Sequence, residues 1–238
     1  MNAMLYGIRV QLKMDIRSKT LLVTCYVVPL LFFAIMGGIF TSLMPEAKNT
    51  LIQSMTVMGV SMGAFIGVPP SMVEVYGTDI KKMYIANGIP LCFGVITLVV
   101  SAFIHLMIMS MIIFTLAPIV FHSTIPSNIP LYFITLALFV IVSLAISCVL
   151  GLAVKNQAKL TMYSQVVFLP SIMLSGIMFS AELLPNFLES MGKLFPATWG
   201  YTLLIQKNID VSTFIPIVII LIISVFISVQ LLKKIRSE

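Results

Sequence analysis

The chain has 238 residues, of which 60% are hydrophobic and only 9% are charged, against a charged share of about 25% in ordinary soluble proteins. This composition excludes a soluble globular protein, and the hydrophobic runs leave no polar segment long enough for a separate catalytic domain. The formal net charge of +6 would suggest nucleic acid binding in a soluble protein, but here the basic residues lie in loops and chain ends, so we expect no nucleic-acid partner.

The first segment, 1–19, is predicted to form an amphipathic helix at the membrane surface. Apolar residues from Leu5 to Ile16 fall on one helical arc, as in helices that lie in the interface with their basic side toward anionic head groups. The basic residues on the next arc are Arg9, Lys13 and Arg17. Asp15 interrupts the apolar arc. The alternative is a plain basic flank that sets the orientation of a retained first span.

Six membrane spans are expected, because six hydrophobic runs approach or exceed the ~20 residues that cross a bilayer. They are 20–44, 51–75, 90–117, 131–154, 160–178 and 214–232. The predicted fold is therefore an all-α polytopic membrane protein with both termini on one side. With cytoplasmic termini, only Lys48, Lys193 and Lys207 of the 14 basic residues would face outward. Loops rich in Lys and Arg stay in the cytoplasm, which favours this orientation.

The second predicted span carries Gly59, Gly63 and Gly67, each four residues from the next. Small residues at this spacing share one face of a helix and allow a neighbouring helix to approach closely. The face is thus a candidate packing or dimer surface, and the pattern leaves open whether the neighbour belongs to the same subunit. Pro69 and Pro70 should kink or break this helix near its end.

A short cytoplasmic helix is predicted within 77–88, after the second span. Thr78 can cap its start, Ile80, Met83 and Tyr84 form an apolar face, and Asn87–Gly88 supplies a left-handed stop. Such a short helix is not stable alone in water. It therefore needs a surface to dock against.

An external hairpin is predicted at 179–207. Pro185 suits the first turn of a short amphipathic helix, Pro196 ends that helix, and 197–207 could form a second. Neither piece is long enough to cross a membrane. A re-entrant hairpin packed against the rest of the protein is consistent with both.

The sequence offers no chemistry for driving transport by itself. The acidic residues, Asp15 among them, are expected in loops or tails, with Glu74 at the edge of the second span. Carboxylates that carry protons or sodium normally lie within the membrane. His105 is the remaining ionisable group of the spans, and we expect a neutral imidazole bonded to a neighbouring helix; a proton relay is the alternative. No GxxxxGK[ST] loop, metal-binding cluster or catalytic set is present, so we expect no enzyme activity in this chain.

Several motifs resemble those of ATP-binding-cassette type-2 exporter permeases. They are Pro170, Leu174-Ser175-Gly176, Leu184-Pro185 and Leu194-Phe195-Pro196-Ala197-Thr198. Gly77-Thr78 after Glu74 is similar to the family's pattern, although the commoner form has more charges before the glycine. The resemblance covers essentially the whole chain. An external loop in an unrelated polytopic protein is the alternative.

The resemblance implies a permease of the bacterial cytoplasmic membrane that works with a second permease and a cassette ATPase. It implies that the short cytoplasmic helix couples the two proteins by fitting a groove on the ATPase, and that the ATPase, not this chain, binds ATP and Mg. The coupling residues would be Gly77, Thr78, Asp79, Ile80, Lys81, Lys82, Met83 and Tyr84. The second permease could be an identical copy or a sister subunit.

Residues near the predicted external end are candidates for the substrate path and gate. They are Phe168, Pro170, Met173, Met178 and Phe179. Flexible thioethers and aromatic rings suit a variable apolar surface, which is compatible with an amphipathic peptide, a hydrophobic drug or a lipid-like molecule. They are also ordinary membrane-helix residues. The alternatives to an exporter are a membrane immunity or assembly factor that transports nothing, and an ion-coupled secondary transporter.

Overall fold

The computed structural model describes residues 3–178, 184–206 and 210–237, and every regular element in these ranges is helical. Segments η1 and η3 are π-helical turns and η2 is a 3₁₀ helix. The elements in chain order are α1 (Ala3–Arg17), α2 (Lys19–Leu22), η1 (Val23–Val27), α3 (Val28–Leu43), η2 (Pro45–Asn49), α4 (Leu51–Met62), η3 (Gly63–Gly67), α5 (Pro69–Tyr76), α6 (Ile80–Ala86), α7 (Cys92–Phe121), α8 (Ile129–Ala153), α9 (Gln157–Met173), α10 (Asn186–Gly192), α11 (Pro196–Ile205) and α12 (Val211–Ser237).

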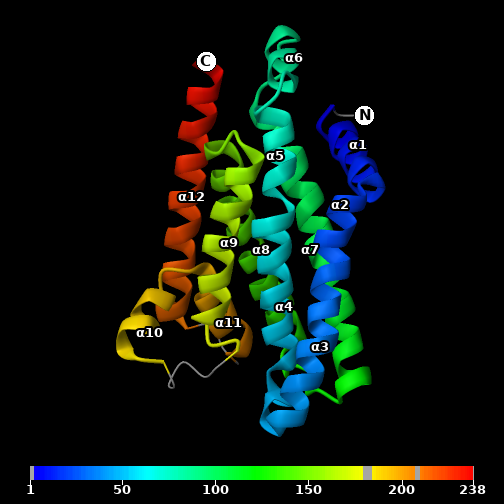
Figure 1. The fold of residues 1–238 in the computed structure, drawn as a ribbon, viewed down its shortest axis with the longest axis vertical. Helices are drawn as coiled ribbons and strands as arrows, with labels where there is room; N and C mark the ends of the chain where they lie inside the picture. Colours follow the sequence, from blue (N-terminus) through cyan, green and yellow to red (C-terminus); the bar gives the residue numbers. More distant parts are fainter. Residues whose placement is uncertain (1–2, 179–183, 207–209, 238) are drawn as a thin grey trace.

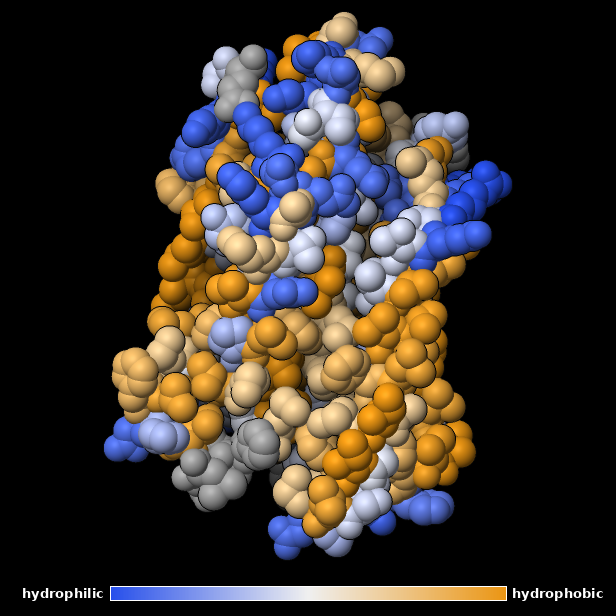
Figure 2. Space-filling view, in the orientation of Figure 1, coloured by the Kyte–Doolittle hydropathy of each residue, from blue (hydrophilic) through white to orange (hydrophobic). Residues whose placement is uncertain are grey.

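The long helices run side by side along one axis, and the short helices lie at the two ends of this bundle (Figure 1). Helices α1 and α6 and the last turns of α12 lie at one end, which we call the basic end. Helices η2, α10 and α11 lie at the other end, which we call the hairpin end. On the face shown in Figure 2, hydrophilic residues gather over the basic end, and a broad hydrophobic band lies below it. This distribution is that of a multi-pass membrane protein.

Five of the six predicted spans are long and apolar enough to cross a membrane. They are Lys19–Leu43, Leu51–Tyr76, Cys92–Phe121, Ile129–Ala153 and Val211–Ser237. The predicted span 160–178 is instead helix α9, which has 17 residues and ends at Met173. Its length of about 26 Å is less than the ~30 Å hydrocarbon core. The helix ends early because the chain turns at Gly176, whose φ is +83°.

The helix from Leu51 to Tyr76 is the centre of the bundle. It is 94% buried along its most apolar stretch, compared with 22% for Lys19–Leu43 and 17% for Val211–Ser237. Helix α4 packs against α3, α7 and α11, and α5 packs against α8. Inside, the hydroxyl groups of Thr56 and Tyr132 lie 2.9 Å apart and satisfy each other. The central helix therefore contacts most of the other spans and connects the two ends.

The glycine stripe on this central helix packs inside the same chain. A Cβ added to Gly59 would lie 2.9 Å from Met109 Cε of α7, and one added to Gly67 would lie 2.9 Å from Cys25 Sγ of η1. Gly63 lies between Leu106 and Cys25. The stripe is thus a helix-packing surface, as predicted, but its partners are α7 and η1, so it is not free to contact a second permease.

The expected break at Pro69 is a π-helical turn. The amide of Val68 donates to the carbonyl of Gly63 at 3.1 Å, which is a bond across five residues. The helix then continues through Pro69 as α5, because a proline in the first turn of a helix loses no backbone hydrogen bond. This turn, η3, lies against the second π-helical turn, η1. Two wide turns therefore meet within the membrane-spanning part of the bundle.

Helix α1 is held to α7 by its polar and small side chains. Gly7 lies against Phe93, and the Asp15 carboxylate accepts hydrogen bonds from Gln11 Nε2, at 2.8 Å, and from Ser101 Oγ. Asp15 is only 4% exposed, so the expectation that it lies in a tail is wrong. Its burial is tolerated because two donors replace water.

The outer face of α1 carries the basic residues that were predicted to face the membrane surface. Arg9, Lys13 and Arg17 are exposed, as predicted for an interfacial helix. Leu5 and Ile16 are also exposed, although they belong to the apolar arc. These two side chains therefore point away from the bundle, where the acyl region of a membrane can cover them, whereas Ile8 and Leu12 of the same arc are half-buried.

Candidate functional site

The hairpin end is built from two short helices joined by a locked turn. Helix α10 ends before Pro196 and helix α11 begins at it. Thr198 Oγ1 donates to the carbonyl of Gly192 at 2.6 Å, and Trp199 Nε1 donates to the carbonyl of Lys193 at 2.7 Å. Helix α11 packs against α4, α8, α9 and α12. Helix α11 is therefore packed against protein, as a non-spanning segment requires.

A cavity of about 810 Å³ opens between the end of α3, the end of α9 and helix α11. Its lining combines apolar side chains with hydroxyl, amide and carboxyl groups. The lining residues are Met44, Pro45, Glu46, Ala47, Thr50, Ser175, Gly176, Ile177, Met178, Thr198, Tyr201, Thr202, Ile205 and Gln206. Such a mixed lining suits an amphipathic ligand, because apolar walls supply contact area and a few polar groups fix its orientation.

Two amide oxygens near this cavity have no hydrogen-bond partner among the described residues. Gln206 donates through Nε2 to Thr213 Oγ1 at 3.0 Å, which leaves its buried Oε1 unsatisfied. Gln53 Oε1 is likewise buried and unsatisfied. Gln53 and Gln206 line a smaller cavity of about 310 Å³ that shares Thr50, Ile205 and Gln206 with the first. Buried acceptors without partners are costly, so both would gain from a ligand with N–H or O–H donors.

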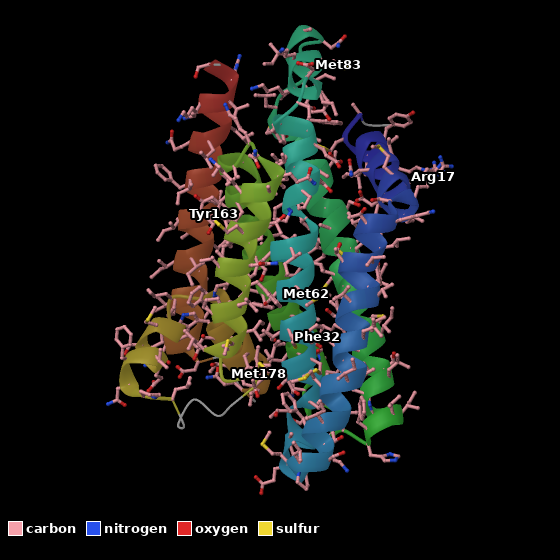
Figure 3. The ribbon with its side chains drawn as sticks, in the orientation of Figure 1. Arg17, Phe32, Met62, Met83, Tyr163 and Met178 are labelled. Atoms are coloured by element: carbon pink, nitrogen blue, oxygen red, sulfur yellow. The ribbon has the colours of Figure 1, made fainter. Side chains whose placement is uncertain are left out.

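Only one of the predicted substrate-path residues lines this cavity. Met178 does so, near the hairpin end (Figure 3). Phe168 is buried in the core, Met173 is exposed, and Pro170 lies within α9. Phe179 lies outside the described residues. The sequence reasoning missed Tyr201 and Gln206, although polar side chains in a short apolar helix were a signal that could have indicated them.

At the opposite end, the segment 77–88, for which a short cytoplasmic helix is predicted, contains helix α6 (Ile80–Ala86). Gly88 has φ +67° and ends it as expected. At its start, Asp79 occupies the N-cap position but makes no side-chain capping bond. Thr78 Oγ1 accepts from the Ile80 amide at 3.4 Å, and its hydroxyl donates to the carbonyl of Glu74 at 2.6 Å. Lys82 Nζ lies 2.7 Å from Asp79 Oδ1. The hydrogen bond from Lys82 and its positive charge hold the pKa of Asp79 below its usual value, and the same contact with Asp79 raises the pKa of Lys82.

The exposed face of α6 differs from the predicted one. Ile80, Met83 and Ile85 are 40%, 63% and 50% exposed, and Met83 lies near the tip of the basic end (Figure 3). Tyr84, expected on this face, turns toward the bundle, where it lies against Gly94 of α7. Lys81 is half-buried. The apolar surface available to another protein is therefore made by Ile80 and Met83, which lie one turn apart, whereas Ile85 lines a cavity beside α12.

Gly77 joins α5 to α6 at a tight point. A Cβ at this position would lie 2.6 Å from the carbonyl oxygen of Val73, which is backbone and cannot move aside. Helix α5 is the main packing partner of α6. The position of α6 is thus set by the central helix.

His105 forms the expected bond to a neighbouring helix. Its Nδ1 lies 2.8 Å from the hydroxyl of Tyr26 on η1, and the two rings meet edge to face. His105 Nε2 is buried and has no partner among the described residues. Ser101, which donates to Asp15, lies one helical turn from His105.

No cluster of three or more His, Cys, Asp or Glu side chains within the described ranges is placed to bind a metal. Cys25 and Cys148 are buried and Cys92 is exposed, and all three are free thiols. A family model described as ABC-2 type transporter matches residues 5–208, most of the chain. No curated protein sequence matches the chain.

Proposed function

Because this chain belongs to the ABC-2 type transporter family, we propose that it is the permease of an exporter driven by a separate ATPase subunit. Members of this family form the membrane domain of a transporter and generally work with such a subunit. In the proposal, ATP and Mg bind to the partner, and this chain supplies the path through the membrane. It has no enzyme activity of its own.

The observation that carries the proposal is the exposed apolar face of α6. Ile80 and Met83 lie one turn apart on a seven-residue helix that projects beyond the basic end. A helix this short gains most of its stability from tertiary packing, and its exposed apolar side chains are available for contact with another protein. A groove on the ATPase would cover these two side chains.

The central helix offers a mechanical route from α6 to the cavity. Helix α6 packs on α5, which continues through η3 into α4. At the far end of this rod, Thr50 lines the cavity and Ser54 Oγ donates to the Tyr201 hydroxyl at 3.2 Å. Movement of α6 would therefore reach the hairpin without crossing a flexible loop. We assign η3, where the helix is widened, as the hinge of this rod.

The proposed substrate is an amphipathic molecule with hydrogen-bond donors, such as a peptide, drug or lipid-like compound. Apolar groups would lie against Ile177, Met178 and Ile205, and donors would reach Gln206 Oε1. Glu46 at the rim would favour a positively charged group. The substrate would leave through the cavity beneath α11.

In the proposed orientation, the basic end faces the cytoplasm of a bacterium and the hairpin end faces outward. The positive-inside rule supports it, because α1, α6 and the last turns of α12 carry eight basic residues: Arg9, Lys13, Arg17, Lys81, Lys82, Lys233, Lys234 and Arg236. These helices lie at one end of the bundle (Figure 1), which requires an even number of crossings. Helix α9, together with the packed hairpin, would complete the sixth crossing.

We propose that a second permease completes the pathway, as an identical copy or a sister subunit. Lys19–Leu43 and Val211–Ser237 are the least buried spans. Exposed side chains on the first of these include Leu31, Phe32 and Ile35. This surface, and not the glycine stripe, is the candidate for the contact between permeases.

A second candidate function is ion-coupled transport, and the buried Asp15 favours it. An intramembrane carboxylate is usually functional, and the Asp15–Ser101 bond lies one helical turn from His105. This candidate predicts transport by the purified chain in an ion gradient without ATP. An immunity or assembly factor would show neither activity.

Co-purification from the native membrane separates these functions. We expect a stoichiometric ATPase subunit whose ATP hydrolysis is faster in the complex than alone. Absence of such a subunit, together with ion-driven uptake into liposomes that contain the chain alone, would contradict the exporter and support the second candidate. Absence of both would support the immunity or assembly factor.

A further inference from the structure

Two adjoining cavities open on the side of the bundle at the basic end. The first, about 420 Å³, lies between the α6–α7 connection and the last turns of α12. The second, about 330 Å³, runs along the seam of α7, α8 and α12. They share Cys92, Val229 and Leu232. The two therefore form one groove, which we call the lateral groove.

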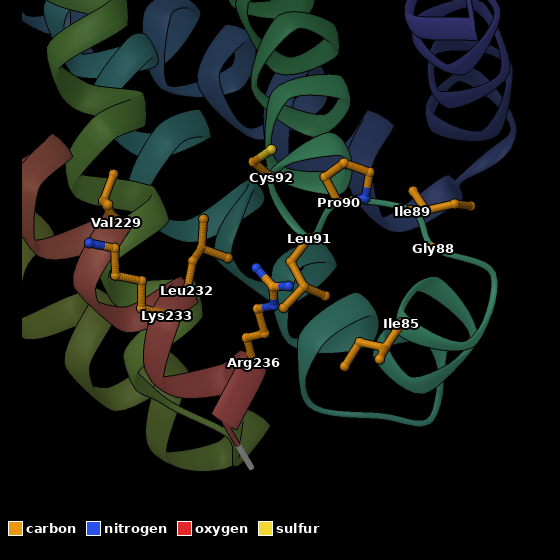
Figure 4. A pocket seen from close by; sticks show the side chains of 10 residues that line it. All are labelled: Ile85, Gly88, Ile89, Pro90, Leu91, Cys92, Val229, Leu232, Lys233 and Arg236. Atoms are coloured by element: carbon orange, nitrogen blue, oxygen red, sulfur yellow. The ribbon is translucent and has the colours of Figure 1, made fainter.

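The lateral groove exists because α12 packs chiefly on α8 and α11, so its basic end stands apart from α7. Its deep part is lined by hydrocarbon side chains such as Val95, Val99 and Val225, and by the thiols of Cys92 and Cys148. The lining residues at its mouth include Lys233 and Arg236 and no acidic residue. Arg236 extends from α12 across the gap toward Leu91 (Figure 4).

Along α12, the apolar residues that line the lateral groove are followed directly by its basic residues. Leu221, Val225, Val229 and Leu232 recur on one face of the helix, and Arg236 lies one turn further on the same face. From Leu221 to Leu232 the helix rises about 16 Å, which is close to the depth of one leaflet, half of the ~30 Å hydrocarbon core. The basic residues thus begin where the apolar depth of one leaflet ends.

We propose that the lateral groove is a binding site for an anionic phospholipid. One acyl chain would lie along α7, α8 and α12, and the phosphate would bind Arg236 and Lys233, since guanidinium and ammonium groups are the usual phosphate ligands. A neutral apolar ligand would leave both cations unused. A polar anion would leave the hydrocarbon seam uncovered.

The bound lipid would join two parts of the bundle that touch little. The mouth includes Ile85 and Gly88, at the end of α6, as well as the last turns of α12. An occupied groove would therefore hold α6 at a defined distance from α12. The inference requires only that the chain lies in a membrane, so it is independent of the proposed source of energy.

The test uses the purified full chain in detergent, with native mass spectrometry to count bound lipid. The probes are dioleoyl phosphatidylglycerol and dioleoyl phosphatidylcholine, which share acyl chains and differ in head-group charge. We expect the anionic lipid to bind more tightly. Each basic residue near a bilayer contributes roughly fivefold, so Lys233→Gln combined with Arg236→Gln should weaken this binding about 25-fold.

Two matched controls separate a built site from surface charge. Lys234→Gln removes an exposed charge of the same helix that does not line the groove, and should change binding little. Val225→Trp fills the apolar part of the groove while keeping both charges, and should weaken binding of the anionic lipid. Ile223→Trp changes an exposed residue outside the groove lining, and should leave that binding unchanged. Size-exclusion profiles and thermal unfolding confirm that each variant is folded.

Three results would overturn the proposal. Equal binding of the two lipids, unaffected by the double substitution, would indicate only the ordinary lipid around any membrane protein. Full anionic binding in Val225→Trp would reduce the site to surface charge. A dimer that forms disulfide bonds through the exposed Cys92 and excludes both lipids would assign the groove to a second copy.

Discussion

At the scale of single residues, Asp15 is the feature that the sequence predicted least well. Its position on an apolar arc indicated a weak point in an amphipathic helix, but the structure shows a buried carboxylate with two donors. Ser101, one of these donors, is 86 residues away in sequence. No local pattern predicts such a pairing, because it depends on how α1 packs against α7.

Replacing Asp15 with Ala should therefore destabilise the protein. Hydrogen bonds to charged groups contribute about 1.5–3 kcal/mol, and the change would also leave the Ser101 hydroxyl unpaired. We expect a lower unfolding temperature in detergent for Asp15→Ala, and less than additive losses when it is combined with Ser101→Ala. Glu74→Ala, at an exposed carboxylate, is the control. Equal stability of the native protein, the Asp15→Ala and Ser101→Ala variants and their combination would contradict the buried bond.

Two glycines should respond oppositely to alanine. At Gly200 of α11, a Cβ would lie 2.6 Å from Phe139 Cε2, whereas at Gly38 the nearest atom is 3.9 Å away. Overpacking costs about 1–3 kcal/mol, and replacing a helical glycine that has space gains up to ~1 kcal/mol. Thermal unfolding should thus rank Gly38→Ala above the native protein and Gly200→Ala below it. The reverse order would contradict the close packing of α11 on α8.

At the scale of elements, most helices could be predicted because they depend on local patterns. The long apolar runs gave five spans, and the prolines and Gly88 marked the limits of α6, α10 and α11. Helix α9 was predicted too long because the turn at Gly176 lies inside an apolar run. The predicted orientation of Tyr84 was wrong, because its side chain occupies space beside Gly94 of α7. Helical periodicity carries no information about such a contact with another helix.

The locked turn of the hairpin gives a prediction for α10. Combining Thr198→Val with Trp199→Phe removes the two side-chain bonds to the carbonyls of Gly192 and Lys193. Each bond contributes about 1 kcal/mol, so amide hydrogen exchange in α10 should become faster, about 10-fold or more, while α11 stays protected by its packing.

Ser190→Ala is the matched control for the hairpin. It removes a hydroxyl bond to the Asn186 carbonyl within α10 and none to α11. If amide exchange in α10 is equally fast in the Thr198→Val, Trp199→Phe variant and in the control, the turn does not hold α10 in place.

At the scale of the whole molecule, the two ends of the bundle are connected by its most buried helix. The cavity lies at one end and the exposed face of α6 at the other. The sequence predicted both ends, because charge distribution and short punctuated helices are visible in it. It did not predict the cavity lining or the lateral groove, since each brings together residues from three or more distant segments.

The proposed orientation can be tested by labelling with a membrane-impermeant maleimide. In a Cys92→Ser background, Ser190→Cys on α10 should be labelled in intact cells, and Asn87→Cys at the end of α6 only after the membrane is opened. Both positions are exposed, so accessibility reports the side of the membrane. Labelling of the two positions from the same side would contradict an arrangement with α6 inside and the hairpin outside.

The central claim is that a separate ATPase binds α6 and drives transport by moving it. The most direct measurement is ATP hydrolysis by the assembled complex. Replacing Ile80 and Met83 with Asp puts charges on the exposed face, and should prevent assembly or abolish the stimulation of hydrolysis while the permease stays folded in the membrane. Phe187→Asp, at an exposed apolar position of the hairpin end, should leave both unchanged. Normal assembly and stimulated hydrolysis in the variant with both α6 substitutions would contradict the account.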